Sequence, residues 1–509
     1  MHKELVVDIN PYQTRVALVE DHELSEIYIE RRGCERLAGN IYNGRVQNVL
    51  PGMQAAFIDI GLGRNAFLYA GDIAGGGADF QFCEADGFNR SDQNIAGLIR
   101  PGQELLVQVL KEPYGTKGAR VTTNISLPGR TMVLMPTVVH IGVSKRIEDE
   151  GERTRLRKLI TEINADKGGV IVRTAAQGME EEDIRADFLY LSELWKKIRD
   201  KSRYASAPRL IHAEEPLVFR TLRDLFTPDI DKLIINHQDY YERILNMAES
   251  ISHTLGDRIA LIENGADLFH SLGLEEQIER ALSRKVWLKN GGYIVIDTTE
   301  AMTIIDVNTG KFVGRHNLQA TITDTNCLAA KEIARQLRLR DVSGIIIIDF
   351  IDMDDALNRE KVLEMLRLEL KKDRVRSAVL GITQLGLVEM TRKKTRRCLS
   401  GSLQTVCPCC NGDGRVLAPE TVALKLQKQL IQRFRDEVNS RYLVEAHPDV
   451  VALIKSSSTQ KEPILQVREG KRLYIRALTG MRPGQYRITA ISSQDEAERL
   501  EKETWVYGL

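Results

Sequence analysis

The sequence has no apolar run long enough to cross a membrane. A membrane-spanning helix needs about 18 or more consecutive apolar residues, and none occurs among the 509 residues. The first residues, Met1–Asp8, also lack the apolar core of a signal peptide. At about 150 residues per domain, and with 43% apolar and 28% charged residues, we expect a cytoplasmic protein of three or four domains.

Nucleotide-binding motifs and net charge are lacking too. Neither G-x-x-x-x-G-K-[ST] nor G-x-G-x-x-G after a strand is present, which disfavours an NTPase or a dehydrogenase. The 71 basic and 71 acidic side chains cancel, so total charge does not indicate a nucleic-acid-binding protein. Positive charge gathers only locally, in Met390–Arg397, where it indicates either a nearby anion or a solvated basic surface.

Cysteine is scarce, and its odd count of seven does not suit a disulfide framework. Cys34, Cys83 and Cys327 are scattered, whereas the other four cluster at Cys398, Cys407, Cys409 and Cys410. The C-x-x-C pair formed by Cys407 and Cys410 is typical of half a tetrahedral zinc site. Either Cys398 and Cys409 complete that site or a second chain does. A redox pair and free structural cysteines remain alternatives.

The order of apolar patterns predicts an α/β protein with several domains. Alternating residues in 1–35 predict a β-meander, and short strands with glycine corners between Asn40 and Thr123 predict a small barrel interrupted by a loop at Gly71–Asn94. Farther along, strand 302–307, helix 325–339 and strand 345–350 form a strand–helix–strand unit, which predicts a right-handed parallel crossover. A helix at 419–438 carries an apolar stripe that suits a partner.

Two aspartates close the two strands of this crossover. Asp306 ends Thr303–Asp306 and Asp349 ends the isoleucine run before it, so both should face one crevice at the carboxyl ends of the strands. We expect them to be buried, and buried carboxylates need a partner or a metal such as Mg²⁺. Asn308 points to the same side as Asp306, whereas Asp352 is a weaker candidate. Strand caps or salt bridges are the alternative.

The predicted barrel combines aromatic and basic residues. Phe57 and Phe67 lie on its strands, near Lys111 and Lys117. Barrels of the OB type bind single-stranded nucleic acid by stacking bases on such aromatics while lysines follow the phosphates. An aromatic residue that simply fills the barrel core is the alternative.

A possible phosphate-binding pair follows a predicted strand at 170–174. Arg173 and Thr174 offer a guanidinium beside a hydroxyl, which suits a terminal phosphate. Taken alone, the pair is a weak signal.

These motifs together resemble the ribonuclease E/G family, in the same order over nearly the whole chain. The matching segments are Asn40–Val46, Pro51–Gly61, Gly115–Ala119, Ile171–Ala175, Thr303–Gly310, Ile346–Met353 and Cys407–Cys410. The resemblance implies an α/β multidomain fold in which an RNase H-like domain is interrupted by an OB-fold barrel and a 5′-sensor region, followed by a DNase I-like catalytic domain, a zinc link and a small C-terminal α/β domain. The implied domain bounds are 1–35 with 215–280, then 36–127, 128–214, 281–397, 398–415 and 416–509.

The resemblance also implies roles for single residues. Asp306 and Asp349 would bind catalytic Mg²⁺, and Asn308 would hold the scissile phosphate. A 5′-monophosphate would be held by Val133, Arg173 and Thr174, and single-stranded RNA by Phe57, Phe67, Lys111 and Lys117. Cys407 and Cys410 would share structural Zn²⁺ with a second protomer of a homodimer or homotetramer.

The resemblance therefore implies a magnesium-dependent endoribonuclease. It would cleave single-stranded A/U-rich RNA, prefer 5′-monophosphorylated ends, and act in rRNA maturation and mRNA decay. A non-catalytic RNA-binding protein and a metal-dependent DNA nuclease remain alternatives. The sequence ends at Leu509 without the long disordered tail of some family members, which argues against a scaffold role. Cys409 and the loop at Gly71–Asn94 depart from the family pattern.

Overall fold

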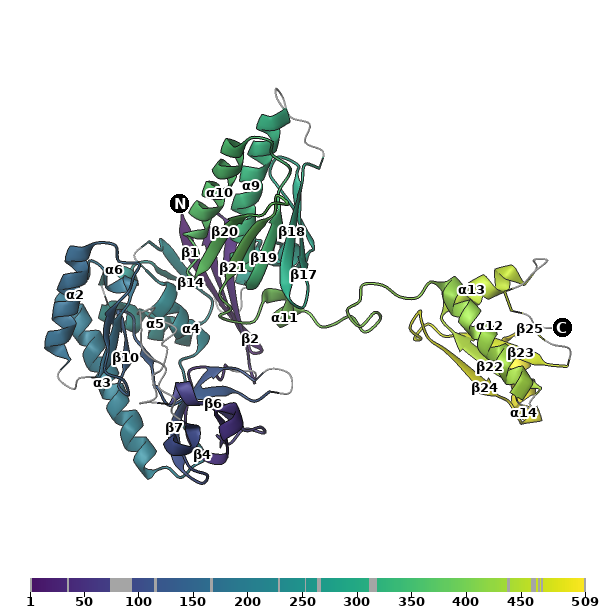
Figure 1. Ribbon diagram of the computed structural model, residues 1–509, viewed down its shortest axis with the longest axis horizontal. Coiled ribbons are helices and arrows are strands. Elements are labelled where there is room, and N and C mark those ends of the chain that lie inside the picture. The colour runs from purple at the N-terminus through teal and green to yellow at the C-terminus, as the bar shows by residue number, and fades with distance from the viewer. Residues whose placement is uncertain are drawn as a thin grey trace. The chain divides into compact units, whose positions relative to one another are not determined.

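The computed structural model describes residues 2–33, 36–73, 94–113, 117–164, 168–227, 229–251, 253–262, 267–310, 318–436, 440–458, 464–465, 467 and 470–507. The chain divides into two compact units, Met1–Ser402 and Leu403–Leu509 (Figure 1). Most of the predicted loop Gly71–Asn94 and the cysteines Cys34 and Cys83 lie outside the described residues. None of the helices in the described ranges has the length and apolarity needed to cross a bilayer.

The first sheet joins the N-terminus to a segment some 230 residues later. Its strands are β1 (Lys3–Ile9), β2 (Gln13–Glu20), β3 (Glu23–Arg31), β14 (Lys232–Ile235) and β15 (Ile259–Leu261), in the order β15-β14-β1-β2-β3. The predicted meander β1–β3 is confirmed as antiparallel, and β14 runs parallel to β1. Helices α4 (Leu217–Leu225) and α5 (Gln238–Ile251) contribute to the apolar core beside this sheet.

The predicted small barrel is also confirmed. It consists of β4 (Ile41–Leu50), β5 (Ala55–Asp59), β6 (Ala66–Tyr69), β7 (Glu104–Lys111) and β8 (Arg120–Thr122), extended by β13 (Arg209–His212). Pairing of β4 with β7 closes the sheet. Residue 118, before β8, must be glycine, because a Cβ there would lie 2.0 Å from the carbonyl oxygen of Asn65.

Arg173 comes directly after an inner strand of a smaller four-stranded sheet. Its strands are β9 (Leu127–Pro128), β10 (Met132–Met135), β11 (Ile141–Val143) and β12 (Gly169–Val172), in the order β11-β12-β10-β9. Helices α2 (Glu150–Ile163) and α3 (Glu181–Tyr204) share its apolar core. The predicted strand 170–174 was too long, because β12 ends at Val172 and a 3₁₀ turn, η3, begins at Thr174.

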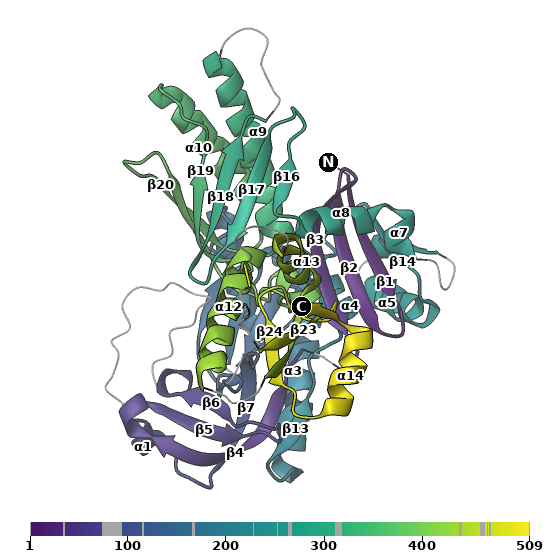
Figure 2. The ribbon, with the colours of Figure 1, turned by 90° about the vertical axis from the view of Figure 1, so that its right-hand side faces the viewer.

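The third sheet contains the predicted crossover. Its strands are β16 (Lys285–Trp287), β17 (Tyr293–Thr298), β18 (Met302–Asn308), β19 (Gly344–Asp349), β20 (Ser377–Ile382) and β21 (Val388–Arg392), in the order β16-β17-β18-β19-β21-β20. Helices α9 (Leu318–Leu339) and α10 (Ala356–Leu370) lie together beside it (Figure 2). Among these neighbours only β18 and β19 are parallel, as expected.

The second unit is a small α/β fold. It consists of α12 (Pro419–Asp436), α13 (Pro448–Ser457), α14 (Gln494–Glu503) and a sheet of β22 (Arg441–Ala446), β23 (Arg472–Ala477), β24 (Tyr486–Ala490) and β25 (Trp505–Tyr507). The stripe Val422, Leu426, Leu430 and Phe434 is buried in this unit's own core. Its interpretation as a partner-binding face was therefore wrong.

A buried ionic cluster joins α9 to the first sheet. The Arg338 guanidinium lies 2.9 Å from a carboxylate oxygen of Glu20 and 2.9 Å from one of Glu26, and all three side chains are less than 10% exposed. Burial by itself would raise the pKa of Glu26, but the charge of Arg338 and a hydrogen bond from Tyr28 outweigh it and lower that pKa. The pKa of Glu20 is lowered by Arg338 in the same way, against the effect of burial.

Replacing Arg338 with Leu should lower the free energy of unfolding by about 3–5 kcal/mol near neutral pH, because two buried carboxylates lose their partner. Since the folded pKa values of Glu20 and Glu26 are lowered, their stabilisation is present above the ordinary value of 4.5 and is lost as the pH falls below it. The deficit should therefore shrink in acid. Denaturant unfolding near neutral pH and at a pH below 4.5 tests this. The control is Arg367→Leu, which breaks an exposed ion pair. Equal losses in the two variants would contradict it.

Candidate functional site

Asp306 and Asp349 are direct neighbours across β18 and β19. They are register partners in the parallel pair, so their backbones are about 4.8 Å apart. The alternating pattern buries Ile305, Ile346 and Ile348 completely and turns both aspartates to the exposed face. The predicted juxtaposition is confirmed, but the expected burial was wrong, because these strands cover a core on one face only.

The two carboxylates form an electronegative centre with Asn308. The Asn308 amide Nδ2 donates to Asp306 Oδ2 at 2.7 Å, so both side chains lie on one side, as expected. The pKa of Asp349 is raised, mainly by partial desolvation and to a smaller extent by the charges of Asp306 and Asp352. A cation would relieve this repulsion.

This donor set fits a hard divalent ion. Two carboxylates and an amide oxygen are ligands that Mg²⁺ accepts while it keeps several waters. Within the described ranges, no group of three or more His, Cys, Asp or Glu side chains is arranged to hold a metal. An ion at this site would therefore rest on Asp306 and Asp349, with water and substrate filling its other positions.

A buried asparagine, which the sequence reasoning missed, fastens the loop after Asp349. Asn326 in α9 is 0% exposed. Its Nδ2 donates to the carbonyl of Ile351 at 2.8 Å, and its Oδ1 accepts from the N–H of Ile351 at 3.1 Å. An asparagine at helical spacing from apolar residues of α9 was the available signal, since buried amides must be satisfied.

The barrel brings three of the four predicted RNA-binding residues, Phe57, Phe67 and Lys111, into one row. Phe57 and Phe67 are register partners with ring centroids 6.2 Å apart in an edge-to-face arrangement, and both are half-buried. The row continues through Arg120 to Lys111, which is exposed at the end of β7. Lys117 is exposed near the start of β8. The alternative of a fully buried core aromatic is wrong for both phenylalanines.

Sequence reasoning also missed Arg120 in this row. Its guanidinium already pairs with Asp72 at 2.7 Å, so it offers less free charge than Lys111 or Lys117. Only the strand register revealed its position, because nothing in the local sequence distinguishes it from other arginines.

Arg173 and Thr174 lie at the rim of the four-stranded sheet. Arg173 Nη1 donates to the carbonyl of Gly129 at 2.7 Å and to Asp224 Oδ1 at 2.8 Å. The Thr174 hydroxyl is 3.0 Å from that of Ser144. Within the described residues, Arg173 Nε and Nη2 have no hydrogen-bond acceptor and can still donate to a ligand. Val133 in β10 is the register partner of Ile171 in β12, two residues before Arg173.

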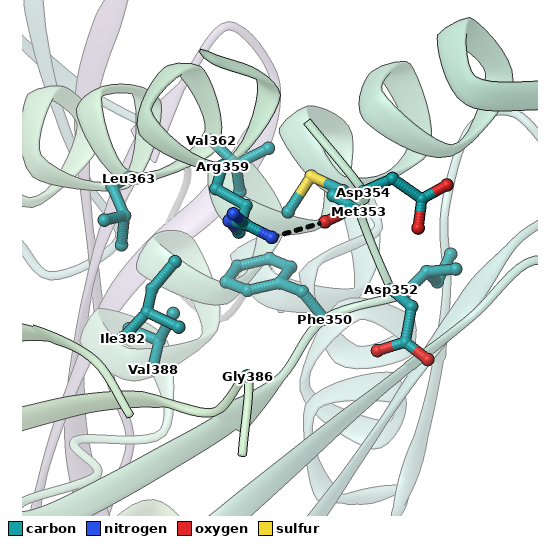
Figure 3. Close-up of a pocket in the computed structure, with 11 residues that line it drawn as sticks. Phe350, Asp352, Met353, Asp354, Arg359, Val362, Leu363, Ile382, Gly386 and Val388 are labelled. Carbon is teal, nitrogen blue, oxygen red and sulfur yellow. Dashed lines mark hydrogen bonds between the residues drawn. The ribbon is translucent and has the colours of Figure 1, made fainter. Parts of the chain in front are cut away.

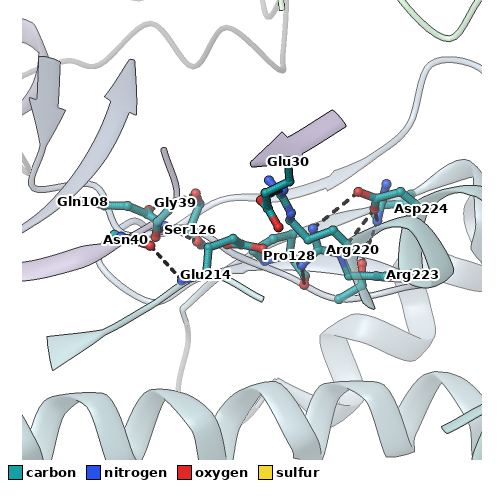
Figure 4. Close-up of polar contacts among 12 residues, drawn as sticks. Glu30, Gly39, Asn40, Gln108, Ser126, Pro128, Glu214, Arg220, Arg223 and Asp224 are labelled. Carbon is teal, nitrogen blue, oxygen red and sulfur yellow. Dashed lines mark hydrogen bonds and ion pairs between the residues drawn. The ribbon is translucent and has the colours of Figure 1, made fainter. Parts of the chain in front are cut away.

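Asp224, which orients Arg173, belongs to a larger polar network (Figure 4). Burial would raise its pKa, but the charges of Arg223 and Arg173 prevail and lower it. Arg223 also donates to Glu214 at 2.9 Å and to the carbonyl of Pro128 at 3.2 Å. Arg173 is thereby held in a defined orientation before any ligand binds.

The cysteine pair forms a tight turn. The N–H of Asn411 donates to the carbonyl of Cys407 at 2.8 Å, and Cys407 and Cys409 are exposed. Backbone N–H groups of Cys410 and Cys409 lower the pKa of Cys407 and so favour the thiolate that zinc requires. Cys398 falls in the first unit and the pair in the second.

Replacing Asn326 with Leu should loosen the chain that follows Asp349. Leaving the Ile351 amide and carbonyl unsatisfied costs about 1–3 kcal/mol, so hydrogen exchange of the Ile351 amide should accelerate about 10- to 100-fold. Exchange measured by mass spectrometry or NMR tests this. The control is Thr323→Val, because that hydroxyl donates within α9, to the carbonyl of Gln319 at 2.8 Å. Equal protection at Ile351 in both variants would refute the role of Asn326.

Comparison with known proteins places these residues in a family. The model of the "Ribonuclease E/G family" matches residues 126–395. "Ribonuclease G" of Escherichia coli is 42% identical over 481 residues, covering 93% of this chain and 97% of the relative. "Ribonuclease G" of Haemophilus influenzae is 43% identical over 479 residues, covering 93% and 96%. "Ribonuclease E" of Haemophilus influenzae is 36% identical over 432 residues, covering 84% of this chain and 46% of the relative. The resemblance found in the sequence is confirmed, and the chain belongs to the ribonuclease E/G family.

Proposed function

We propose that this protein is an endoribonuclease that hydrolyses single-stranded, A/U-rich RNA with Mg²⁺ held by Asp306 and Asp349. The observation that carries the proposal is the in-register pairing of these two carboxylates on an exposed sheet face. Its relatives named ribonuclease support the choice of RNA as substrate. We further propose that it acts in the cytoplasm on rRNA precursors and mRNA.

The side chains at the centre have complementary tasks in this proposal. Asp306 and Asp349 hold the ion, and Asn308, already fixed to Asp306 at 2.7 Å, orients the scissile phosphate. When bound, Mg²⁺ lowers the pKa of an attacking water and offsets charge on the phosphate. Exposure of the two aspartates leaves room for an extended RNA strand above the sheet. The products carry a 5′-phosphate and a 3′-hydroxyl.

Two other surfaces select the substrate. The half-exposed rings of Phe57 and Phe67 stack bases, while Lys111 and Lys117 follow the phosphates. Arg173 and Thr174, with Val133, hold a 5′-monophosphate, for which Arg173 keeps donor groups available. A 5′-triphosphate is bulkier and more highly charged than this small site accommodates.

We also propose the finer architecture. The order β15-β14-β1-β2-β3, with three antiparallel strands and two parallel ones, supports an RNase H-like domain. The closed β4–β8 barrel supports an OB-fold, and the β16–β21 sheet supports a DNase I-like catalytic domain.

A short RNA carrying either a 5′-monophosphate or a 5′-hydroxyl tests the function. With Mg²⁺, the protein should cleave both internally and the monophosphate form faster. Asp306→Asn and Asp349→Asn should each reduce cleavage at least about 100-fold, because one ligand loses its charge. Arg173→Ala should remove the preference for monophosphate ends while basal cleavage continues.

The control for Arg173→Ala is Arg185→Ala, an exposed arginine of α3 in weak ion pairs. RNA that is bound but left whole would instead favour a non-catalytic RNA-binding protein. Equal cleavage of a matched DNA would favour a DNA nuclease, because base stacking does not distinguish the sugars.

We propose that Cys407 and Cys410 share one structural Zn²⁺ with a second protomer of a homodimer or homotetramer. Replacing both with Ser should remove bound zinc and halve the particle mass, as atomic emission and light scattering would report. Cys327→Ser, in α9, is the control. Cys409→Ser decides whether a third thiol takes part. Unchanged mass and zinc content in the double variant would rule out the shared ion.

A further inference from the structure

A cavity of about 390 Å³ lies just beyond the carboxyl end of β19 (Figure 3). One part of its wall is apolar and comes from three elements. Phe350 follows β19, Val362 and Leu363 come from α10, and Ile382 and Val388 come from the β20–β21 hairpin. Its volume is within the range of small-ligand sites.

The rest of the wall holds three charged side chains together with Ile351, Met353 and Gly386. Asp352 and Asp354 lie on the side opposite Leu363, Ile382 and Val388, and Arg359 lies between the two sides (Figure 3). Arg359 Nη1 donates a hydrogen bond to the carbonyl oxygen of Met353 at 2.8 Å. Within the described residues its Nε and Nη2 have no acceptor. Asp354 Oδ2 already accepts from Gln319 Nε2 at 2.7 Å. The cavity therefore offers one cationic donor, the exposed carboxylate of Asp352 and the other oxygen of Asp354 beside an apolar wall.

This cavity adjoins the pair of aspartates. Asp349 is the residue immediately before Phe350, and Asp352, which lines the cavity, is close enough to raise the pKa of Asp349. Ligands of α/β sheets bind in crevices outside the carboxyl ends of strands. A nucleotide whose phosphate lies at Asp306 and Asp349 would thus have its base beside the cavity.

We propose that the cavity binds the base of the nucleotide next to the scissile phosphate and prefers adenine to uracil. The inference rests on the proposed function. A base turned out of a single strand needs an apolar surface for its face and hydrogen-bonding groups for its edge. Asp352 or Asp354 accepts from the exocyclic amino group, and Arg359 donates to a ring nitrogen. Uracil has a single donor on this edge, its N3–H, set between two carbonyl oxygens, so a carboxylate that accepts from it also meets an oxygen that repels it.

The composition of the cavity argues against a phosphate as its occupant. Two carboxylates at the rim outweigh the charge of the one arginine and repel an anion. The charge pattern therefore favours a neutral group with both donors and acceptors at its edge.

The test uses short 5′-monophosphorylated RNAs with one cut site, in which each position flanking the cut is adenine, uracil or abasic in turn. For the parent protein, kcat/KM should favour adenine over uracil about tenfold at one flanking position. Arg359→Met removes the donor, and Ile382→Phe fills the cavity without touching the bond to Met353. Both should bring that ratio close to one.

The matched control is Leu385→Phe, in the same hairpin but 85% exposed and outside the cavity. It should keep the parent's ratio. An unchanged ratio in both cavity variants, or the same fall in the control, would overturn the inference.

Binding without divalent metal separates this inference from the proposed function. With divalent metal removed by a chelator, the parent protein should bind the adenine RNA more tightly than the RNA that is abasic at that position. The two cavity variants should bind both RNAs with equal affinity. Equal affinities for the parent would overturn the base site even if cleavage is robust. If the parent leaves every RNA intact, the proposed function fails, while this difference in affinity still decides whether the cavity takes a base.

Discussion

The parallel, in-register pairing of β18 with β19 is the constraint on which the candidate site depends. A parallel pair needs a long crossover, and α9 supplies it. The register places Asp306 opposite Asp349, and a slip of one residue would turn one carboxylate into the core. Asn326 in α9 binds the chain just after Asp349, so the crossover helix both sets the register and holds the loop.

Two arginines then connect this sheet to the rest of the first unit. Arg338 of α9 reaches Glu20 and Glu26 of the first sheet, and Arg374, before β20, donates to the carbonyl of Asp224 at 2.7 Å. Asp224 also orients Arg173. The proposed phosphate sensor and the sheet that carries Asp306 and Asp349 are therefore linked through a few residues. Such polar links fix orientation more than they add stability, since desolvation offsets much of their attraction.

Several parts of the structure could be predicted from local pattern. The meander, the barrel strands and the strand–helix–strand unit follow from periodicity and glycine corners, because these signals reflect the faces that each element buries. Errors occurred where tertiary contacts decide. The sequence of residues 275–286 predicts one helix, but α8 (Leu274–Leu282) ends earlier, because Lys285–Trp287 pairs with β17 instead. The apolar stripe on α12 packs into the core of its own unit. No local signal in the sequence could distinguish this from packing against a partner protein.

The sequence by itself determined the types of residue available for chemistry: two aspartates that close adjacent strands, an Arg–Thr pair, aromatics with lysines, and one C-x-x-C. Their order along the chain also pointed to the family. Only the tertiary structure decided that Asp306 and Asp349 are exposed, that Arg120 joins the aromatic row, and that a cavity opens beside Asp349. The physical reason is that exposure and neighbourhood depend on packing between distant segments, whereas periodicity reports only which face of one segment is apolar.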